Sequence, residues 1–328
     1  MRKTLLIMFL TLTMGQAVSA QSQRGGLFGR IENKLRARYE KIGYDTLYMT
    51  RPNSKLTLKF RGNLSGTTIE GKDKAEGGTI TSKYETTTRG TVSVGASYLG
   101  VSLAVAVNPG NLSGKNKDTE LSINTYGNRF GLEAAYQDSK TLSGDLHQNE
   151  YSYHIAKGDL RYTMFSVTGY YAFNHRRFSY PAAFTQSFIQ KRSAGSWLVG
   201  ATFQSGRLKN ADDAPDELHD TRLSMTSLAI GGGYGYNFVV KKWLFHVSAQ
   251  PSLIVYNNSS IRVNGEKLEE GTYFPDFVIN TRVAIVYNFS KKYFAGSTFL
   301  FNTSVLGDKD SYTSLENWRA RAFLGIRL

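Results

Sequence analysis

The last segment of the chain, residues 316–328, alternates between two kinds of side chain. Its even positions are mostly apolar: Trp318, Ala320, Ala322, Leu324, Ile326 and Leu328. Its odd positions carry most of the polar groups: Asn317, Arg319, Arg321, Phe323, Gly325 and Arg327. Residues two apart on a β-strand share one face of the sheet. Because a dry core does not accept repeated arginines and a hydrated barrel lumen does, the pattern predicts a strand of a membrane-spanning barrel.

Residues 277–289 show the same alternation. The odd face carries Phe277, Ile279, Thr281, Val283, Ile285, Tyr287 and Phe289, and the even face Val278, Asn280, Arg282, Ala284, Val286 and Asn288. Applied to the whole chain, this test predicts about twelve strands. They cover 55–69, 79–98, 100–107, 118–126, 129–138, 161–174, 195–206, 222–237, 243–257, 276–289, 293–305 and 316–328. The predicted fold is all-β, a transmembrane antiparallel β-barrel with a short N-terminal periplasmic helix.

The first twenty residues have the layout of a cleaved secretory signal peptide. Arg2 and Lys3 precede an apolar stretch that ends at Leu12, and small residues up to Ala20 form the cleavage site. Residues 21–54 are predicted to be a periplasmic segment with a helix over about 28–41, and residues 55–328 to be the barrel. The absence of cysteine excludes disulfides and a lipid-modified cysteine. These features predict an outer-membrane location in a Gram-negative cell.

Composition supports this class of protein over a secreted β-sandwich, which is the alternative. The chain has 32 Gly, 20 Tyr, 19 Phe and only 6 Pro. Its formal charge of +14 would suggest a nucleic-acid partner in a cytosolic protein. Here the export signal and the scattered positions of the charges argue against one.

The predicted connections alternate between long and short. The long ones, 70–78, 108–117, 139–160, 207–221, 258–275 and 306–315, are assigned to the cell exterior, and short turns such as Gly127-Asn128 to the periplasm. Aromatic residues near the short turns fit an interfacial girdle: Tyr98, Phe173, Trp197, Trp243, Tyr287 and Tyr293. Residues 174–196 break this rule, because about twenty residues stand where a short turn is expected. Ser179 and Pro181 favour the start of a short helix with an apolar stripe, which would end after Lys191 and Arg192 and form a plug or a docking element. A plain strand extension is the alternative.

The same segment carries a family resemblance. RRFSYPAAFTQSFIQKRSAGS at 176–196, with YDTLYM at 44–49, resembles an uncharacterised outer-membrane family of Bacteroidota, the domain of unknown function numbered 4421. The matching positions are Tyr44, Asp45, Thr46, Tyr48, Arg177, Phe178, Ser179, Tyr180, Ala182, Ala183, Phe184, Gln186, Gln190, Lys191, Arg192, Ser193, Ala194, Gly195 and Ser196. The resemblance implies an outer-membrane barrel and no particular activity. The terminal Leu328 departs from the aromatic residue that usually ends such barrels.

Two groups of residues are candidates for a site. His246 and Ser248 share the inward face of one strand and are weak candidates for the catalytic pair of a lipid hydrolase. Basic residues are candidates for binding: Arg282, Arg319 and Arg321 in the lumen, and Arg176, Arg177, Lys191 and Arg192 on the plug segment. Pairing of the lumen cations with Glu133 and other acids in a closed lumen is the competing interpretation. The acid-rich loop 207–221 matches no calcium motif, and no cofactor or metal site is predicted.

The sequence therefore predicts an outer-membrane barrel that acts as a small non-enzymatic channel or as a membrane scaffold. A lipid-modifying hydrolase, phospholipase or deacylase, and a surface adhesin or receptor are the alternatives. The expected partners are outer-membrane lipids and lipopolysaccharide, together with a periplasmic protein bound through residues 174–196.

Overall fold

The structure, a computed structural model, describes residues 27–40, 43–75, 78–99, 101–107, 118–211, 221–263, 266–268, 276–307 and 311–328. The chain divides into two units, Met1–Gly43 and Tyr44–Leu328. In the first unit, helix α2 covers Leu27–Glu40, and the periplasmic role predicted for this segment stays a prediction. The predicted signal peptide lies outside the described residues. None of the described helices is long and apolar enough to cross a membrane.

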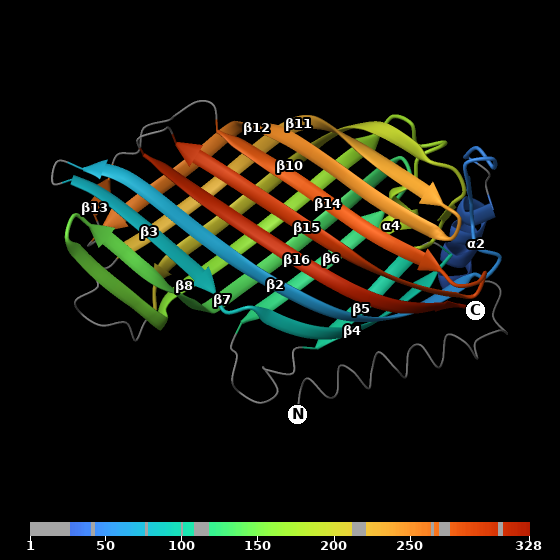
Figure 1. The fold of residues 1–328 in the computed structure, drawn as a ribbon, viewed down its shortest axis with the longest axis horizontal. Coiled ribbons are helices and arrows are strands. Elements are labelled where there is room, and N and C mark those ends of the chain that lie inside the picture. Colours follow the sequence, from blue (N-terminus) through green and yellow to red (C-terminus); the bar gives the residue numbers. More distant parts are fainter. Residues whose placement is uncertain are drawn as a thin grey trace. The chain divides into compact units, whose positions relative to one another are not determined.

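The second unit is an antiparallel barrel with a ring closed by hydrogen bonds between β2 and β16. Its strands tilt around one axis (Figure 1). The ring contains β2 (Leu56–Ala75), β3 (Gly78–Thr86), β7 (Phe130–Gln148), β8 (Tyr151–Ala172), β10 (Ala194–Asn210), β11 (Thr221–Val240), β12 (Trp243–Val263), β14 (Phe277–Asn288), β15 (Tyr293–Gly307) and β16 (Tyr312–Arg327). Going round from β2, the order is β16, β15, β14, β12, β11, β10, β8, β7 and β3. Closure of the ring gives every strand two neighbours, so that backbone N–H and C=O groups find hydrogen-bond partners where a bilayer offers no water.

The remaining strands extend this ring. β3 and β4 (Arg89–Tyr98) pair with the same strand, β2, one after the other. Residues 68–75 of β2 pair with β3, and residues 56–65 of β2 pair with β4. β5 (Val101–Val107) pairs with β4, and β6 (Thr119–Tyr126) pairs with β7. The closed ring therefore has ten of the fourteen strands of the described sheet, and β4, β5, β6 and the short β13 lie outside it. About twelve strands were predicted, and the predicted strands 100–107 and 118–126 are present as β5 and β6. They lie outside the closed ring because, among the described residues, β5 pairs only with β4, and β6 only with β7. Short β13 (Glu266–Leu268) pairs with β12.

Strands extend into five of the six predicted long loops, and two of these loops are almost wholly strand. Residues 70–75 continue β2, and residues 139–160 form a hairpin in which β7 and β8 meet at a turn at 149–150. Loop sequence and strand sequence are alike here, because both are polar once a hairpin leaves the apolar band. Residues 108–117, 212–220 and 269–275 of the other predicted loops lie outside the described residues.

The two ends of the barrel differ in their connections. We call the end with the short turns, residues 241–242 and 289–292 among them, the turn end, and the opposite end the loop end. Both motif stretches, 44–49 and 176–196, lie at the turn end, as do α4 and the C-terminus (Figure 1).

The predicted inward and outward faces are confirmed. Every even residue of β14 from Val278 to Val286 is buried, whereas its odd neighbours are half-buried. Outward residues such as Phe60, Leu253 and Leu324 are exposed, forming an apolar outer surface. The predicted girdle residues Trp197 and Trp243 are exposed beside the turn end, at 68% and 43%.

Candidate functional site

Residues 174–193 leave the wall of the barrel after β8 and fill the lumen at the turn end. We call this segment the plug. Its helix α4 covers Tyr180–Phe184, and its short strand β9 covers Ile189–Gln190. Ser179 caps the helix by accepting a hydrogen bond from the Ala182 backbone N–H at 3.2 Å, and Pro181 stands at the first turn, where its missing N–H is harmless. Phe178 and Ala183 are fully buried. The predicted helix start at Pro181 is thus confirmed, but the helix ends at Phe184 instead of near Arg192, because β9 follows it. The plain strand extension was wrong.

The plug packs against the wall on all sides. One apolar cluster joins Ala182, Ala183 and Phe188 of the plug to Leu244, Val286 and Phe294 of the wall. A second joins Phe178 and Tyr180 to Tyr126, Tyr170 and Leu198. These contacts bury the aromatic stripe seen in the sequence, so the plug is a folded part of the barrel core.

The plug also brings together the two motif stretches of the sequence. Strand β1, Met49–Thr50, pairs with β9, and the Asp45 backbone N–H donates to the Arg176 carbonyl at 2.7 Å. The Asp45 carboxylate accepts from Arg177 Nε at 3.2 Å. Lys191 Nζ donates to the Thr46 carbonyl at 2.8 Å. Residues 44–51 and the exposed part of the plug thus form one surface, which we call the platform.

Gln190 is the centre of this arrangement. Its buried Oε1 accepts from the Ser179 backbone N–H and from Asn237 Nδ2, both at 3.1 Å. Its Nε2 lies within 3.2 Å of the carbonyl oxygens of Tyr48, Arg177 and Arg192. A single amide therefore ties the plug to the platform and to strand β11.

A chain of hydrogen bonds runs from the plug through the candidate catalytic pair. Tyr180 Oη donates to Ser248 Oγ at 2.9 Å, which lies 3.1 Å from His246 Nε2. His246 Nδ1 lies 2.7 Å from Asn237 Oδ1. Because the amide oxygen only accepts, Nδ1 carries a proton. In the neutral imidazole Nε2 then accepts from the Ser248 hydroxyl. Burial raises the pKa of Tyr180, which keeps its hydroxyl protonated as this chain requires.

This chain has the order of groups found in a serine nucleophile activated by a base and an orienting residue. Here the hydroxyl of Ser248 is only 2% exposed and is already bonded to the plug. The arrangement anchors Tyr180 in the described state.

Lys59 anchors the opposite side of the plug. Its ammonium donates to the Thr185 carbonyl at 2.6 Å and to Gln186 Oε1 at 2.9 Å. Gln186 has a backbone φ of 56°, a left-handed value that is strained for a residue with a side chain. The bond to Lys59 and a bond from Gln186 Nε2 to the Ala183 carbonyl hold that conformation.

Above the plug, the lumen holds a polar layer with ion pairs across it, which we call the middle layer. Arg282 of β14 pairs with Glu133 of β7, on the opposite side of the ring, at 3.0 Å. Arg319 pairs with Glu120, which Arg89 also approaches at 3.6 Å. Asn280 donates to Thr202, and Ser304 to Gln204, between strands that are not neighbours. The predicted pairing of lumen cations with Glu133 is therefore present.

The described part of the loop end is packed as well. Ile69, Leu160, Tyr162, Met164 and Leu315 belong to a buried apolar cluster with residues of β10 and β11 from across the ring. A second cluster contains Ala229, Ile254, Val278 and Leu306. The described lumen is thus filled in three layers, with apolar packing on both sides of a polar middle.

The predicted site residues fall into three places. Arg176, Arg177, Lys191 and Arg192 are exposed on the platform. Arg282, Arg319 and Arg321 face the middle layer, where the first two are paired. His246 and Ser248 lie against the plug. Among the described residues, no cluster of His, Cys, Asp and Glu could hold a metal ion.

The family model described as a domain of unknown function, DUF4421, matches residues 43–327. The chain belongs to this family. The DUF4421 region coincides with the barrel unit and includes both stretches of the platform, so the resemblance noted in the sequence is confirmed. The predicted origin in Bacteroidota stays a prediction. None of the curated proteins matches the chain.

Solved structures similar to this DUF4421 chain share little sequence with it. The outer membrane protease OmpT from Escherichia coli is 9% identical, with 88% of this chain and 100% of that one covered and a TM-score of 0.41. The translocator domain of the autotransporter NalP from Neisseria meningitidis is 10% identical, with 91% and 95% covered and a TM-score of 0.28. The toluene transporter TodX of P. putida is 7% identical, with 84% and 90% covered and a TM-score of 0.24.

Sequence reasoning missed several residues that hold the DUF4421 plug. Asn237 of β11 and Asn128 of the turn between β6 and β7 bind Ser179, through its carbonyl and its hydroxyl. Lys59, which donates to Thr185 and Gln186, belongs to the same group. The strand alternation could have indicated this role for two of them. It places Lys59 and Asn237 on the inward face near the turn end, where a polar side chain that faces a plug needs a hydrogen-bond partner.

Proposed function

We propose that the protein is a non-conducting outer-membrane scaffold that docks an acidic periplasmic protein through its platform. The observation that carries this proposal is the filled lumen. The ion pair between Arg282 and Glu133 crosses the ring, and the space left beside the middle layer is a cavity of about 70 Å³. Ligand sites are typically several times larger. A barrel of this kind serves as an anchor better than as a conduit.

A membrane location is supported by the outer surface. Exposed apolar residues such as Phe60, Val94, Val255 and Leu324 cover the outside of the strands, with Trp197 and Trp243 near the turn end. The short turns lie at the turn end, together with the start of β2 and the end of β16. In barrels of this type that side faces the periplasm. The platform therefore faces the periplasm in this proposal.

The charge of the platform suggests the chemistry of the partner. Arg176, Lys191 and Arg192 are exposed there. Among residues 44–51 and 174–193, Asp45 is the single acid, and it is paired with Arg177. Leu47 projects beside these cations with 58% of its surface exposed. A cationic surface around an exposed apolar residue suits an acidic protein with an apolar contact at its centre.

Planar-bilayer recording tests the scaffold half of the proposal. The refolded barrel, checked by its heat-modifiable mobility on a gel, is expected to give no steady current. Replacing residues 178–192 by a four-residue turn is expected to leave the barrel nearly silent, because the middle layer and the loop-end clusters remain. A steady anion-selective current from the folded natural protein would overturn the proposal in favour of a channel.

Site-specific photocrosslinking tests the docking half. A photoreactive residue at Leu47 is expected to give a defined adduct with an acidic periplasmic protein, identified by mass spectrometry. The same residue at Tyr151, 83% exposed at the loop end, is the matched control. The adduct should disappear in the double variant Arg176→Glu and Arg192→Glu. An adduct that survives this reversal of charge, or the same adduct at both positions, contradicts the docking proposal.

A hydrolase is the second candidate, because Asn237, His246 and Ser248 have the order of a catalytic relay. It requires displacement of Tyr180 from Ser248. Phospholipase and deacylase assays on the natural protein and on the plug-shortened barrel test it. Activity that appears in a folded barrel and is lost on Ser248→Ala would establish the hydrolase and remove the scaffold.

A further inference from the structure

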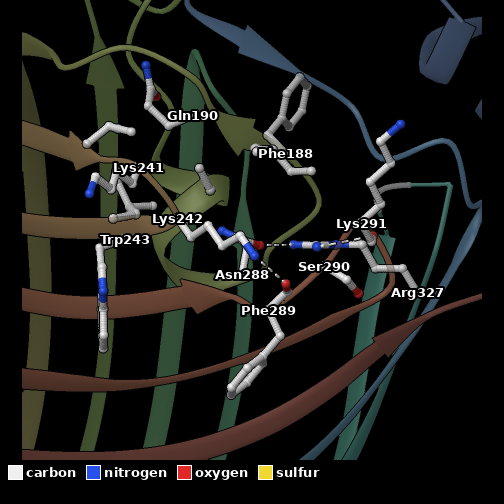
Figure 2. Close-up of a pocket in the computed structure, with 14 residues that line it drawn as sticks. Phe188, Gln190, Lys241, Lys242, Trp243, Asn288, Phe289, Ser290, Lys291 and Arg327 are labelled. Atoms are coloured by element: carbon white, nitrogen blue, oxygen red, sulfur yellow. Dashed lines mark hydrogen bonds between the residues drawn. The ribbon is translucent and has the colours of Figure 1, made fainter.

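A second recess lies at the turn end, beside the plug and apart from the platform cations. It is a pocket of about 380 Å³ between the plug and the two hairpin turns that join β11 to β12 and β14 to β15. Phe188 and Gln190 of the plug lie on one side and Trp243 and Phe289 on the other, with Lys242, Asn288 and Arg327 between them (Figure 2). The pocket has the volume of a small-ligand site.

The lining of this pocket combines cations with apolar side chains. Lys241, Lys242, Lys291 and Arg327 supply positive charge, and no lining residue is acidic. Ala182, Phe188, Val239 and Leu244 supply an apolar wall. The lining therefore suits a ligand that joins an anionic group to a hydrocarbon part.

Arg327 is the buried cation of this pocket, and its neighbours hold it in place. It is 3% exposed and stacks on the ring of Phe294 at 4.5 Å. Its Nη2 donates to Asn288 Oδ1 at 2.9 Å, and its Nη1 lies 3.4 Å from the Lys291 carbonyl. Its Nε is buried and has no protein partner. A buried guanidinium with a spare donor is arranged to bind an oxygen anion, because an unmade hydrogen bond there costs free energy.

The position of the pocket identifies the source of the anion. Trp243 and Phe289 are exposed next to it, at 43% and 51%, and exposed Tyr293 follows Lys291 and Lys292. Exposed aromatics beside lysines mark the level of lipid headgroups in a membrane protein. We propose that this pocket binds the phosphate group of an anionic phospholipid from the leaflet at the turn end. This inference rests on the membrane location proposed above, and it is separate from docking at the platform.

Native mass spectrometry of the detergent-solubilised barrel, titrated with phosphatidylglycerol or phosphatidylcholine, tests the site. The expected result is a retained phosphatidylglycerol and little retained phosphatidylcholine. The double variant Lys241→Gln and Lys291→Gln changes exposed side chains and should weaken phosphatidylglycerol retention by roughly tenfold or more, since lysines near a lipid surface each contribute measurably. Lys140→Gln with Lys157→Gln, exposed at the loop end, is the matched control and should retain the lipid.

Each other outcome overturns the inference in a recognisable way. Equal retention of the two lipids, or equal loss in both double variants, shows that the pocket does not select the headgroup. Competition by glycerol 3-phosphate at the same concentration as the lipid shows a soluble phosphate site instead. A barrel that fails to insert into vesicles contradicts the proposed membrane location, whereas insertion with no lipid selectivity contradicts the pocket alone.

Discussion

The turn end and the middle layer of this lumen are filled by different chemistry. At the turn end, an inserted segment is held by apolar packing and largely by uncharged groups, with Gln190, Asn237 and Tyr180 as anchors. In the middle layer, side chains of the strands meet each other, and Arg282 and Glu133 carry full charges. The first kind of filling requires one extra stretch of chain. The second requires only inward residues on strands that face each other.

This difference predicts different responses to mutation. Uncharged groups that form several hydrogen bonds each contribute a small part of the stability, so losing one removes little. A buried charge depends on a single counter-ion, and losing that counter-ion leaves the charge uncompensated. Single substitutions should therefore harm the middle layer most, and the plug should lose stability in smaller steps. Free energies of unfolding, measured in urea for the barrel refolded into lipid vesicles, provide the comparison.

Glu133→Ala is expected to have the largest effect, because it leaves Arg282 buried with no counter-ion. Arg282 is 3% exposed, and breaking such a pair typically costs about 3–5 kcal/mol. Adding Arg282→Met, which removes the isolated charge, should restore most of the lost stability. If Glu133→Ala alone costs less than about 1 kcal/mol, water or another ion already screens the arginine, and the middle layer is not dry.

Gln190→Ala should have the next largest effect, because several buried groups lose their partner together. The backbone N–H of Ser179 and Asn237 Nδ2 would each lose an acceptor, so the expected cost is about 3 kcal/mol. Gln137→Ala is the matched control, since Gln137 donates to Thr67 in the middle layer and should cost about 1 kcal/mol. Equal costs for the two glutamines would show that Gln190 is no special anchor.

Much of the barrel could be predicted from the sequence, because one physical rule repeats along it. The alternation around Arg282 predicted which side chains face the lumen, and the alternating burial of β14 agrees. The ten-strand ring could not be predicted, because strand periodicity does not say which strands are neighbours. The hairpin at 139–160 was missed for a related reason, since its polar residues read equally well as a loop.

The candidate site was predictable only in part. The excess length of 174–196 and Pro181 indicated an inserted helix, whereas the stretch at Tyr44 was noted only for its family resemblance. Their contact depends on β1 pairing with β9, which is a tertiary event with no local signal. The bonds from Lys59 and Asn237 to the plug are likewise formed between residues far apart in the chain.

His246→Phe separates packing from hydrogen bonding at the plug. His246 lies within ring contact of Phe178, Tyr180 and Phe184, so phenylalanine keeps an aromatic ring there. It removes the bonds to Asn237 and Ser248, and the expected cost is about 2 kcal/mol. His154→Phe, an exposed histidine beside Asp145, is the control and should cost less than about 0.5 kcal/mol. A neutral result for His246→Phe would mean that ring packing alone holds the plug.

Arg177→Ala is expected to have the smallest effect. Arg177 bonds Asp45 at 3.2 Å and lies over the ring of Tyr48 at 5.0 Å, but its side chain is 55% exposed. Exposed ion pairs contribute less than about 1 kcal/mol, because water screens them. Asp45→Ala should cost more, because Asp45 Oδ1 also accepts from the Leu47 backbone N–H at 3.0 Å.

A double-mutant cycle of Arg177 and Asp45 separates these two contributions. The coupling energy should stay below about 1 kcal/mol and decrease as salt is added. The remaining cost of Asp45→Ala should be independent of salt, because it reports a turn held by a local hydrogen bond. A coupling above about 2 kcal/mol would place this pair with the buried charges of the middle layer and would remove the contrast between the two fillings of the lumen.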